Sequence, residues 1–302
     1  MTFAVLFAAV SIAFPPEGEQ LPHLERCYVM GFADAGEDVL SASCLAPRAA
    51  KDIPVGKTGA WATVIDVKPG TNVVEVGGVR RSFTIAPIAP TDPIALKKTY
   101  TKLPYAADSA KPHPVGRKPE EITIVLDAGH GGPSTGAVSP HGLPEKDVNL
   151  RLTKAVRDVL VKRGYKVIMT REDDTDIDLY DRPKVAHRAN ADLFVSIHHN
   201  APGHASHPFE IRYQAVYAWN AIGERLAKAI NARMAAADPA LTNRGVKHAN
   251  FVVTRNPEIP SCLIEADFIT HPDGESAAWD AARRPGVAAA IADGIADWVA
   301  GK

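Results

Sequence analysis

The chain has 302 residues, a length that exceeds one small domain and suits two. Its 34 basic and 35 acidic side chains nearly cancel, which excludes the strongly basic surface typical of a nucleic-acid-binding protein. Three cysteines are too few for a disulfide scaffold and include no CxxC metal pair. The sequence leaves undecided whether Cys27 and Cys44 form a single disulfide bond.

The N-terminus begins with an apolar run that reaches residue 14. A helix that crosses a bilayer needs roughly 20 apolar residues, so no transmembrane segment is predicted here. Two interpretations of this run stay open. It is the remnant of a signal peptide, although a basic start and a clear cleavage site are missing, or it contains a first β-strand over residues 10–14.

Residues 10–86 are rich in short apolar segments separated by turns. Several short strands at this spacing favour a small β-sandwich of the immunoglobulin kind, and no catalytic cluster occurs among them. Prolines then recur through residues 87–120, where they resist both helices and central strands, so this stretch is predicted to be a linker. The predicted strands after the first are 27–30, 62–67, 72–76 and 82–85.

Residues 121–302 alternate between strand and helix patterns. This alternation is typical of an α/β domain with a mostly parallel sheet. Apolar residues at helical spacing, followed by Gly164, predict a first helix that ends near that glycine. The predicted strands are 122–126, 165–170, 192–197 and 261–264, and the predicted helices are 148–160, 222–230 and 287–299.

Two candidate chemical groups lie between the first strand and the first helix. His130 occurs in a glycine-rich segment directly after the strand, where the backbone can approach a bound group closely. Glu145 lies just before the helix. Each has a simpler interpretation: His130 could belong to an ordinary glycine turn, and Glu145 could complement the positive N-terminus of the helix.

Two further candidates follow later strands. His198 ends an apolar strand, although a single histidine there is more often a hydrogen-bonded structural residue. Glu265 ends a strand whose apolar pattern predicts burial. An unpaired buried carboxylate is costly unless it has a metal, a partner or a proton to transfer.

The positions of the four candidates agree with one another. Three follow strands and one opens the helix after the first strand, so all can meet at one edge of the sheet. His130, Glu145 and His198 form a three-ligand set that leaves a fourth position open for water, as a catalytic zinc site requires. Glu265 would then act as the base.

The region from residue 122 to about 275 resembles the zinc-dependent N-acetylmuramoyl-L-alanine amidases of amidase type 3. The resemblance rests on an ordered series of motifs that spans half of the chain. It implies a phosphorylase/hydrolase-like α/β fold with zinc held at His130, Glu145 and His198. It also implies a catalytic glutamate at Glu265. The matching segments are 126–132, Glu145 with 146–150, Thr170-Arg171 with Leu179 and Arg182, 189–198, and Glu265.

The chain also departs from the family pattern. It has Asp267 where the family usually has glycine. It has Thr270 and His271 where the family usually has serine and asparagine. Beside the second histidine ligand, His199 is predicted to be a surface residue rather than a substrate contact.

Two arginines of the matching motifs are predicted to have structural roles. We expect Arg171 and Arg182 to pair with carboxylates near Asp173 and Asp181. The alternative is that one of these arginines binds a carboxylate of the substrate.

The resemblance implies hydrolysis of the amide bond between N-acetylmuramic acid and L-alanine in peptidoglycan, with Zn²⁺ as cofactor. Such an enzyme would serve cell-wall remodelling, daughter-cell separation or recycling, and would act in the cell envelope, either periplasmic or secreted. Peptidoglycan is the expected partner, nucleic acid is not, and the chain is expected to be a monomer. The N-terminal domain could position the enzyme on the wall, bind an activator, or serve only as a spacer.

Two alternative functions stay open. Similar α/β scaffolds support several chemistries, so one alternative is a zinc peptidase that acts on stem peptides. The other is a wall-binding protein without catalytic activity, although the intact set of four candidate residues argues against it. Only one helix is evident between His198 and Glu265, so we expect no insertion that covers the site and therefore an open cleft.

Overall fold

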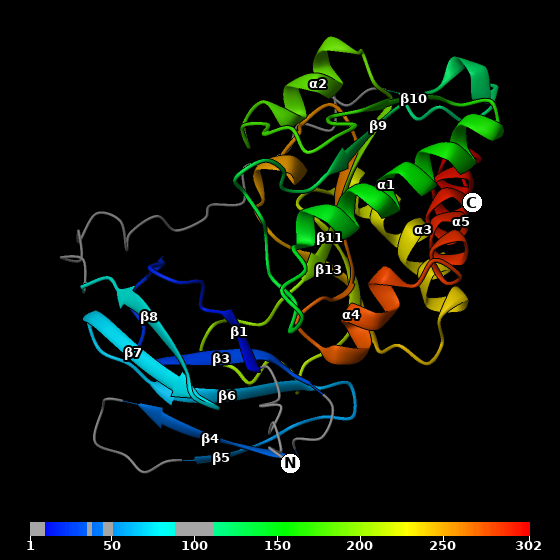
Figure 1. Ribbon diagram of the computed structural model, residues 1–302. Helices are drawn as coiled ribbons and strands as arrows, with labels where there is room; N and C mark the ends of the chain where they lie inside the picture. The colour runs from blue at the N-terminus through cyan, green and yellow to red at the C-terminus, as the bar shows by residue number, and fades with distance from the viewer. Residues whose placement is uncertain (1–9, 35–37, 45–50, 88–111) are drawn as a thin grey trace.

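The computed structural model describes residues 10–34, 38–44, 51–87 and 112–302. Figure 1 shows two units. The strands of residues 10–86, here called the N-terminal unit, lie against one end of a layered α/β body. That body consists of residues 112–302 and is here called the C-terminal unit.

The N-terminal unit contains two β-sheets whose buried side chains form one hydrophobic cluster. Strands form at each of the predicted positions, including Val10–Phe14, so this part of the apolar N-terminal run is a strand, whereas residues 1–9 lie outside the described residues. The immunoglobulin-like assignment and the domain boundaries stay predictions. One sheet has the order β1 (Val10–Phe14), β3 (Arg26–Ala33), β6 (Ala60–Asp66); the other has the order β2 (Gln20–Leu21), β8 (Val79–Ile85), β7 (Gly70–Val76), β4 (Val39–Cys44), β5 (Lys51–Pro54).

Cys27 does not form the bridge to Cys44 that the sequence left open. Cys27 is a free thiol in β3, is fully buried, and donates a hydrogen bond to the carbonyl of Tyr28 at 3.2 Å. Burial raises the pKa of this thiol to about 12, so it stays protonated and unreactive.

A six-stranded sheet forms the centre of the C-terminal unit, which confirms the predicted α/β class. Its four strands β10, β9, β11 and β14 are parallel neighbours, whereas β12 is antiparallel to β14 and parallel to the edge strand β13. The sheet is therefore mostly parallel at the strands that carry the candidate residues. In sheet order the strands are β10 (Lys166–Met169), β9 (Thr123–Ala128), β11 (Leu193–Asn200), β14 (Ser261–Phe268), β12 (Gln214–Ala218) and β13 (Asn243–His248).

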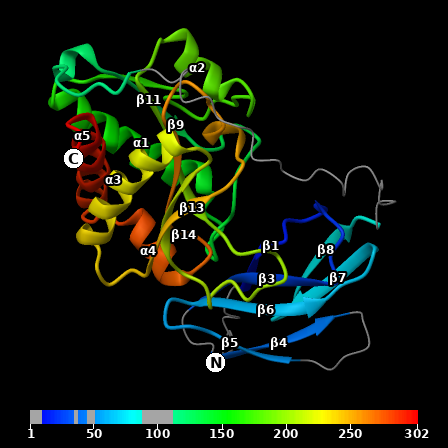
Figure 2. The same ribbon diagram turned by 180° about the vertical axis from the view of Figure 1, so that it is seen from behind.

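Helices cover both faces of this sheet (Figures 1 and 2). Side chains alternate along each strand, so Leu126 of β9 joins the cluster with the long helices while its neighbour Val125 faces the other layer. Gly164, at φ 93°, follows the end of α1 as predicted. One face carries α1 (Glu145–Lys162), α3 (Ala221–Ala237) and α5 (Arg284–Val299), and the other carries α2 (Arg182–Arg188) and the short 3₁₀ helix η4 (Val252–Thr254); α4 (Pro272–Trp279) follows β14.

The strand register aligns the carboxyl ends of β9, β11 and β14, where the candidate residues lie. Ile197 of β11 pairs with Ala128 of β9, and His198 pairs with Glu265 of β14. The segment after His198 contains β12, α3 and β13, so it is more structured than the single helix that the sequence indicated, while the openness of the cleft stays a prediction. None of the helices in the described ranges is long and apolar enough to span a membrane.

Candidate metal centre

Three side chains converge at the carboxyl edge of the parallel strands. His130, Glu145 and His198 each offer one ligand atom, and these atoms all lie within 4.8 Å of one another. The structure thus brings together the three residues that the sequence selected as metal ligands, although they are 15 to 68 positions apart in the chain.

His130 lies two residues beyond the end of β9, in the left-handed backbone region at φ 62°. A side chain with a Cβ atom rarely adopts this conformation, and such residues cluster at functional sites. Its Nδ1 atom lies 3.0 Å from the hydroxyl of Ser134, and its Nε2 atom lies 3.3 Å from a carboxylate oxygen of Glu145. The turn therefore directs the ring toward the cluster.

Glu145 is the first residue of α1 and is almost completely buried. Its Oε1 atom accepts hydrogen bonds from the side-chain amide of Asn149 at 2.9 Å and the backbone N–H of His199 at 3.2 Å, and its Oε2 atom accepts one from the N–H of Ala137 at 2.9 Å. Burial alone would raise the pKa of Glu145, but hydrogen bonds and charge from the two histidines outweigh it and hold the pKa well below its usual value. The carboxylate is therefore ionised.

His198 lies in β11, with its Nδ1 atom 2.9 Å from Oε1 of Glu145. Its ring is nearly perpendicular to that of His130, with the ring centroids 4.9 Å apart. Two glycines leave room for these rings. A Cβ atom at Gly129 would lie 2.2 Å from the His198 ring, and one at Gly136 would lie 2.6 Å from the His130 ring.

Glu265 stands beside His198 in the sheet register. Its side chain is half-buried, but its Oε2 atom is buried and has no hydrogen-bond partner among the described residues. Burial and the neighbouring charge of Glu145 raise the pKa of Glu265 well above its usual value. A buried carboxylate oxygen without a partner is expensive, so this atom is placed to interact with something that binds in the site.

The family model described as N-acetylmuramoyl-L-alanine amidase matches residues 124–297, which include all four of these side chains. This chain belongs to that family. The curated relatives of this amidase include AmiA, an N-acetylmuramoyl-L-alanine amidase of Escherichia coli (strain K12), which is 33% identical over 57% of this chain and 74% of AmiA. They also include LytH of Staphylococcus epidermidis, a probable cell wall amidase, which is 30% identical over 81% of this chain and 80% of LytH.

Solved amidase structures resemble the C-terminal unit. The structure of N-acetylmuramoyl-L-alanine amidase AmiC2 of Nostoc punctiforme matches with a TM-score of 0.56 and 31% identity, and the match covers 61% of this chain and 99% of AmiC2. The family match begins at residue 124, beyond the N-terminal unit.

The prediction that His199 is a surface residue of the amidase is wrong. His199 is buried, and its Nδ1 atom lies 2.9 Å from the side-chain oxygen of Asn149. Burial lowers the pKa of His199 to about 4, so the ring is neutral. Asn149 also donates to Glu145, which means that His199 fixes the residue that orients the candidate ligand.

The two arginines have structural roles. The partner near Asp181 that was predicted for Arg182 is wrong, whereas Arg171 does contact Asp173, through the backbone carbonyl of Asp173 at 2.8 Å. Arg182 forms a buried ion pair with Asp127 at 2.9 Å. Arg171 donates to backbone carbonyls, including those of Ala128 at 2.8 Å and Gly129 at 2.9 Å. Both arginines therefore hold the end of β9, from which the amidase presents its first histidine.

Asp267, which stands where the family usually has glycine, has its negative charge paired within the fold. Asp267 is fully buried and accepts two hydrogen bonds from the guanidinium of Arg212, at 3.0 and 2.9 Å. Thr270 is also buried, and His271 accepts a hydrogen bond from the backbone N–H of Asp273 at 3.1 Å, which caps α4. Asp267 and His271 thus hold the segment after β14 through their hydrogen bonds, whereas the buried hydroxyl of Thr270 has no hydrogen-bond partner among the described residues.

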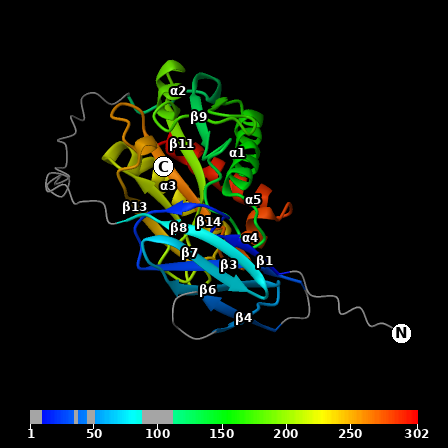
Figure 3. The same ribbon diagram turned by 60° about the vertical axis from the view of Figure 1, so that its left-hand side comes forward.

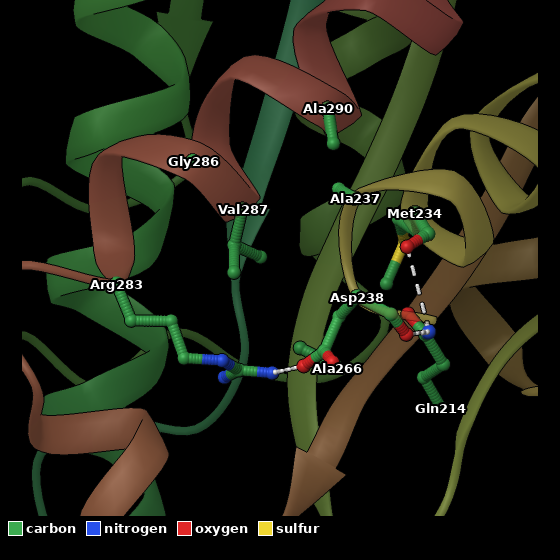
Figure 4. A pocket seen from close by; sticks show the side chains of 9 residues that line it. All are labelled: Gln214, Met234, Ala237, Asp238, Ala266, Arg283, Gly286, Val287 and Ala290. Carbon is green, nitrogen blue, oxygen red and sulfur yellow. Dashed lines mark hydrogen bonds and ion pairs between the residues drawn. The ribbon is translucent and has the colours of Figure 1, made fainter. Parts of the chain in front are cut away.

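A separate cavity of about 270 Å³ lies between α3, β14 and α5 (Figure 4). Its two charged lining residues, Arg283 and Asp238, pair with each other at 2.6 Å. Ala266 also lines it, and this residue points to the opposite face of β14 from its neighbour Glu265. The cavity is therefore not part of the candidate metal centre.

Proposed function

We propose that this chain is a zinc-dependent hydrolase that cleaves the amide bond between N-acetylmuramic acid and L-alanine in peptidoglycan. The observation that supports this most directly is the His130, Glu145 and His198 cluster beside the unpartnered oxygen of Glu265. Membership in the amidase family supports the substrate.

The donor set suits zinc. Imidazole nitrogens and a carboxylate oxygen are common zinc ligands, and three of them with an open fourth position are typical of catalytic zinc. One ligand atom from each of the three residues lies within 4.8 Å of the others, so a single ion can contact all three. When bound, zinc would make water a nucleophile near neutral pH and polarise the amide carbonyl.

The protein would supply proton transfer and orientation. Glu265 would accept a proton from the attacking water and deliver it to the leaving nitrogen of L-alanine. The raised pKa of Glu265 suits a group that must hold and then release a proton, and a nearby cation would favour its ionised form. Asn149 and the N–H of His199 would keep the Glu145 carboxylate in place as a ligand.

We expect the enzyme to act as a monomer in the cell envelope, where its substrate lies, and the N-terminal unit to contact the wall or an activator. A zinc peptidase that acts on stem peptides is the second candidate, because the fold does not decide which amide is cut. Digestion of purified sacculi, with chemical identification of the products, separates the two. Release of stem peptides with a free L-alanine amino group supports the amidase, whereas cleavage within the stem peptide supports the peptidase.

A further inference from the structure

The N-terminal unit lies against one end of the C-terminal unit (Figures 1 and 3). Three segments of the C-terminal unit meet it, and each follows a strand that contains a candidate residue or, for β9, precedes one. His141 follows β9, Phe209 follows β11 and Pro272 follows β14. The docking face is therefore the catalytic edge and not the back of the amidase domain.

The contacts across this interface are mostly aromatic. The ring of His204 stacks on Phe14, with centroids 5.5 Å apart, and lies 6.1 Å from the ring of Tyr28. The backbone N–H of Tyr28 donates to the carbonyl of His204 at 2.7 Å. Phe209 packs against the hydrophobic cluster of the N-terminal unit. Buried ring contacts of this kind favour one defined docking geometry.

One contact leads directly toward the cluster. Phe32 of β3 packs on the ring of His141, with centroids 4.3 Å apart. The Nδ1 atom of the same His141 ring lies 2.7 Å from a carboxylate oxygen of Glu275 in α4. His141 is thus held between an aromatic ring of one unit and a carboxylate of the other.

Glu275 in turn holds the segment that precedes Glu145. Its carboxylate accepts hydrogen bonds from the hydroxyl of Ser139 and from the backbone N–H of His141. The same Ser139 hydroxyl accepts a hydrogen bond from the N–H of Leu143 at 3.0 Å, which closes a tight turn. Glu275 is almost completely buried and so is fixed in position.

The two sides of this turn meet at the ligand. A β-bridge joins residues 138 and 144, and the N–H of Glu145 donates to the carbonyl of Ala137 at 2.8 Å. The N–H of Ala137 then donates to the Glu145 carboxylate at 2.9 Å. A chain of direct contacts therefore connects Phe32, His141, Glu275 and the hairpin of residues 137–145 to the candidate ligand.

We infer that Glu275 and Phe32 are positioning residues of the metal centre, and that the N-terminal unit sets the geometry of Glu145 from across the domain interface. This inference rests on the proposed zinc function. Outer contacts that orient a metal ligand typically change metal affinity by 10-fold to 100-fold when they are lost. Because Phe32 acts through His141, Glu275 and the hairpin of residues 137–145, its effect should be near the lower limit of this range.

The test measures Zn²⁺ affinity of the full chain by competition with a chromophoric chelator. Phe32→Ala and Glu275→Gln should each weaken zinc binding by about 10-fold, and excess zinc should restore most of the amidase activity. Phe32→Tyr keeps an aromatic ring at this position, so this variant should bind zinc as tightly as the wild-type chain. Phe83→Leu is the matched control, because Phe83 is buried in the same unit but is not part of the contact chain, and it should leave the affinity unchanged.

Wild-type affinity in folded Phe32→Ala protein would overturn the inference, as would an equal loss in Phe83→Leu, which would point to general destabilisation. Should Glu275→Gln fail to fold, Phe32→Ala decides alone, since Phe32 is only partly buried. Absence of zinc binding by the wild-type chain would instead contradict the proposed function.

Discussion

The two units of the molecule differ in what they bury. In the described part of the chain, every buried residue with a polar or charged side chain, tyrosine and tryptophan aside, lies between Asp127 and Glu275 in the C-terminal unit. The core of the N-terminal unit is built from apolar and aromatic side chains. Burial of a polar group costs free energy unless the group is paired. Many buried polar groups in one unit therefore indicate that they serve a structural or functional role there. Among them, Asn149 donates to the candidate ligand Glu145, and Arg182 donates to the backbone carbonyl of the candidate ligand His130.

The largest effects should come from the three proposed ligands. His130→Ala and His198→Ala each remove a donor, so zinc content and hydrolysis of sacculi should fall together, and Glu145→Ala should behave in the same way. Metal analysis and digestion of sacculi on one preparation check this. His248→Ala, at an exposed position, is the control. Full zinc affinity in Glu145→Ala protein would show that Glu145 is only a helix-end residue.

A large effect on stability is expected at Arg182. Arg182→Ala leaves the buried carboxylate of Asp127 without its cation, which should lower the free energy of unfolding by about 3–5 kcal/mol. In the N-terminal unit, Arg26 and Asp66 form an exposed pair 3.7 Å apart, so Arg26→Ala should cost at most about 1 kcal/mol. Urea unfolding of both variants makes the comparison, and similar losses would contradict it.

A moderate effect is expected when the N-terminal unit is removed. All four site residues follow the predicted linker, so the sequence predicts that a fragment from about residue 117 folds and binds one zinc ion. The structure favours a start at residue 112, because His113 packs on Trp298 with ring centroids 4.4 Å apart. This fragment should bind zinc about 10-fold more weakly than the full chain. A soluble fragment without zinc affinity would contradict the ligand set or the domain boundary.

The smallest effect should be the reaction of the two buried thiols with a labelling reagent. Burial raises the pKa values of Cys27 and Cys262, one in each unit, so neither should react with a thiol reagent at pH 8 in the folded protein. Mass spectrometry of labelled peptides resolves the two sites during denaturation. Rapid labelling of Cys27 without denaturant would show that the N-terminal unit opens readily.

The candidate site was predictable because it depends on topology. Ends of parallel strands meet at one edge of a sheet, so His130, His198 and Glu265 could be brought together from sequence position alone. Helices α1 and α5 were also predictable, because their apolar residues recur at helical spacing. The edge strand β13, Asn243–His248, has few apolar residues and no alternation, so its sequence pattern does not indicate a strand.

Side-chain pairing was not predictable in the same way. Arg182 pairs with Asp127, 55 residues away, and not with the neighbouring Asp181 that the sequence suggested. His199 follows His198 along β11, yet it is buried and contacts Asn149 of α1. The role of Glu275 depends on contacts between segments more than 130 residues apart. Such pairs follow from three-dimensional packing, which local sequence patterns do not encode.

The most direct test of the proposed zinc mechanism is the Glu265→Gln variant. This change keeps the size of the side chain but removes the carboxylate that should accept the proton of the attacking water. The zinc content and fold should stay unchanged, while hydrolysis of purified sacculi should fall by roughly 100-fold to 10,000-fold. Near-normal hydrolysis by zinc-loaded Glu265→Gln protein would contradict the mechanism and leave Glu265 as a structural residue.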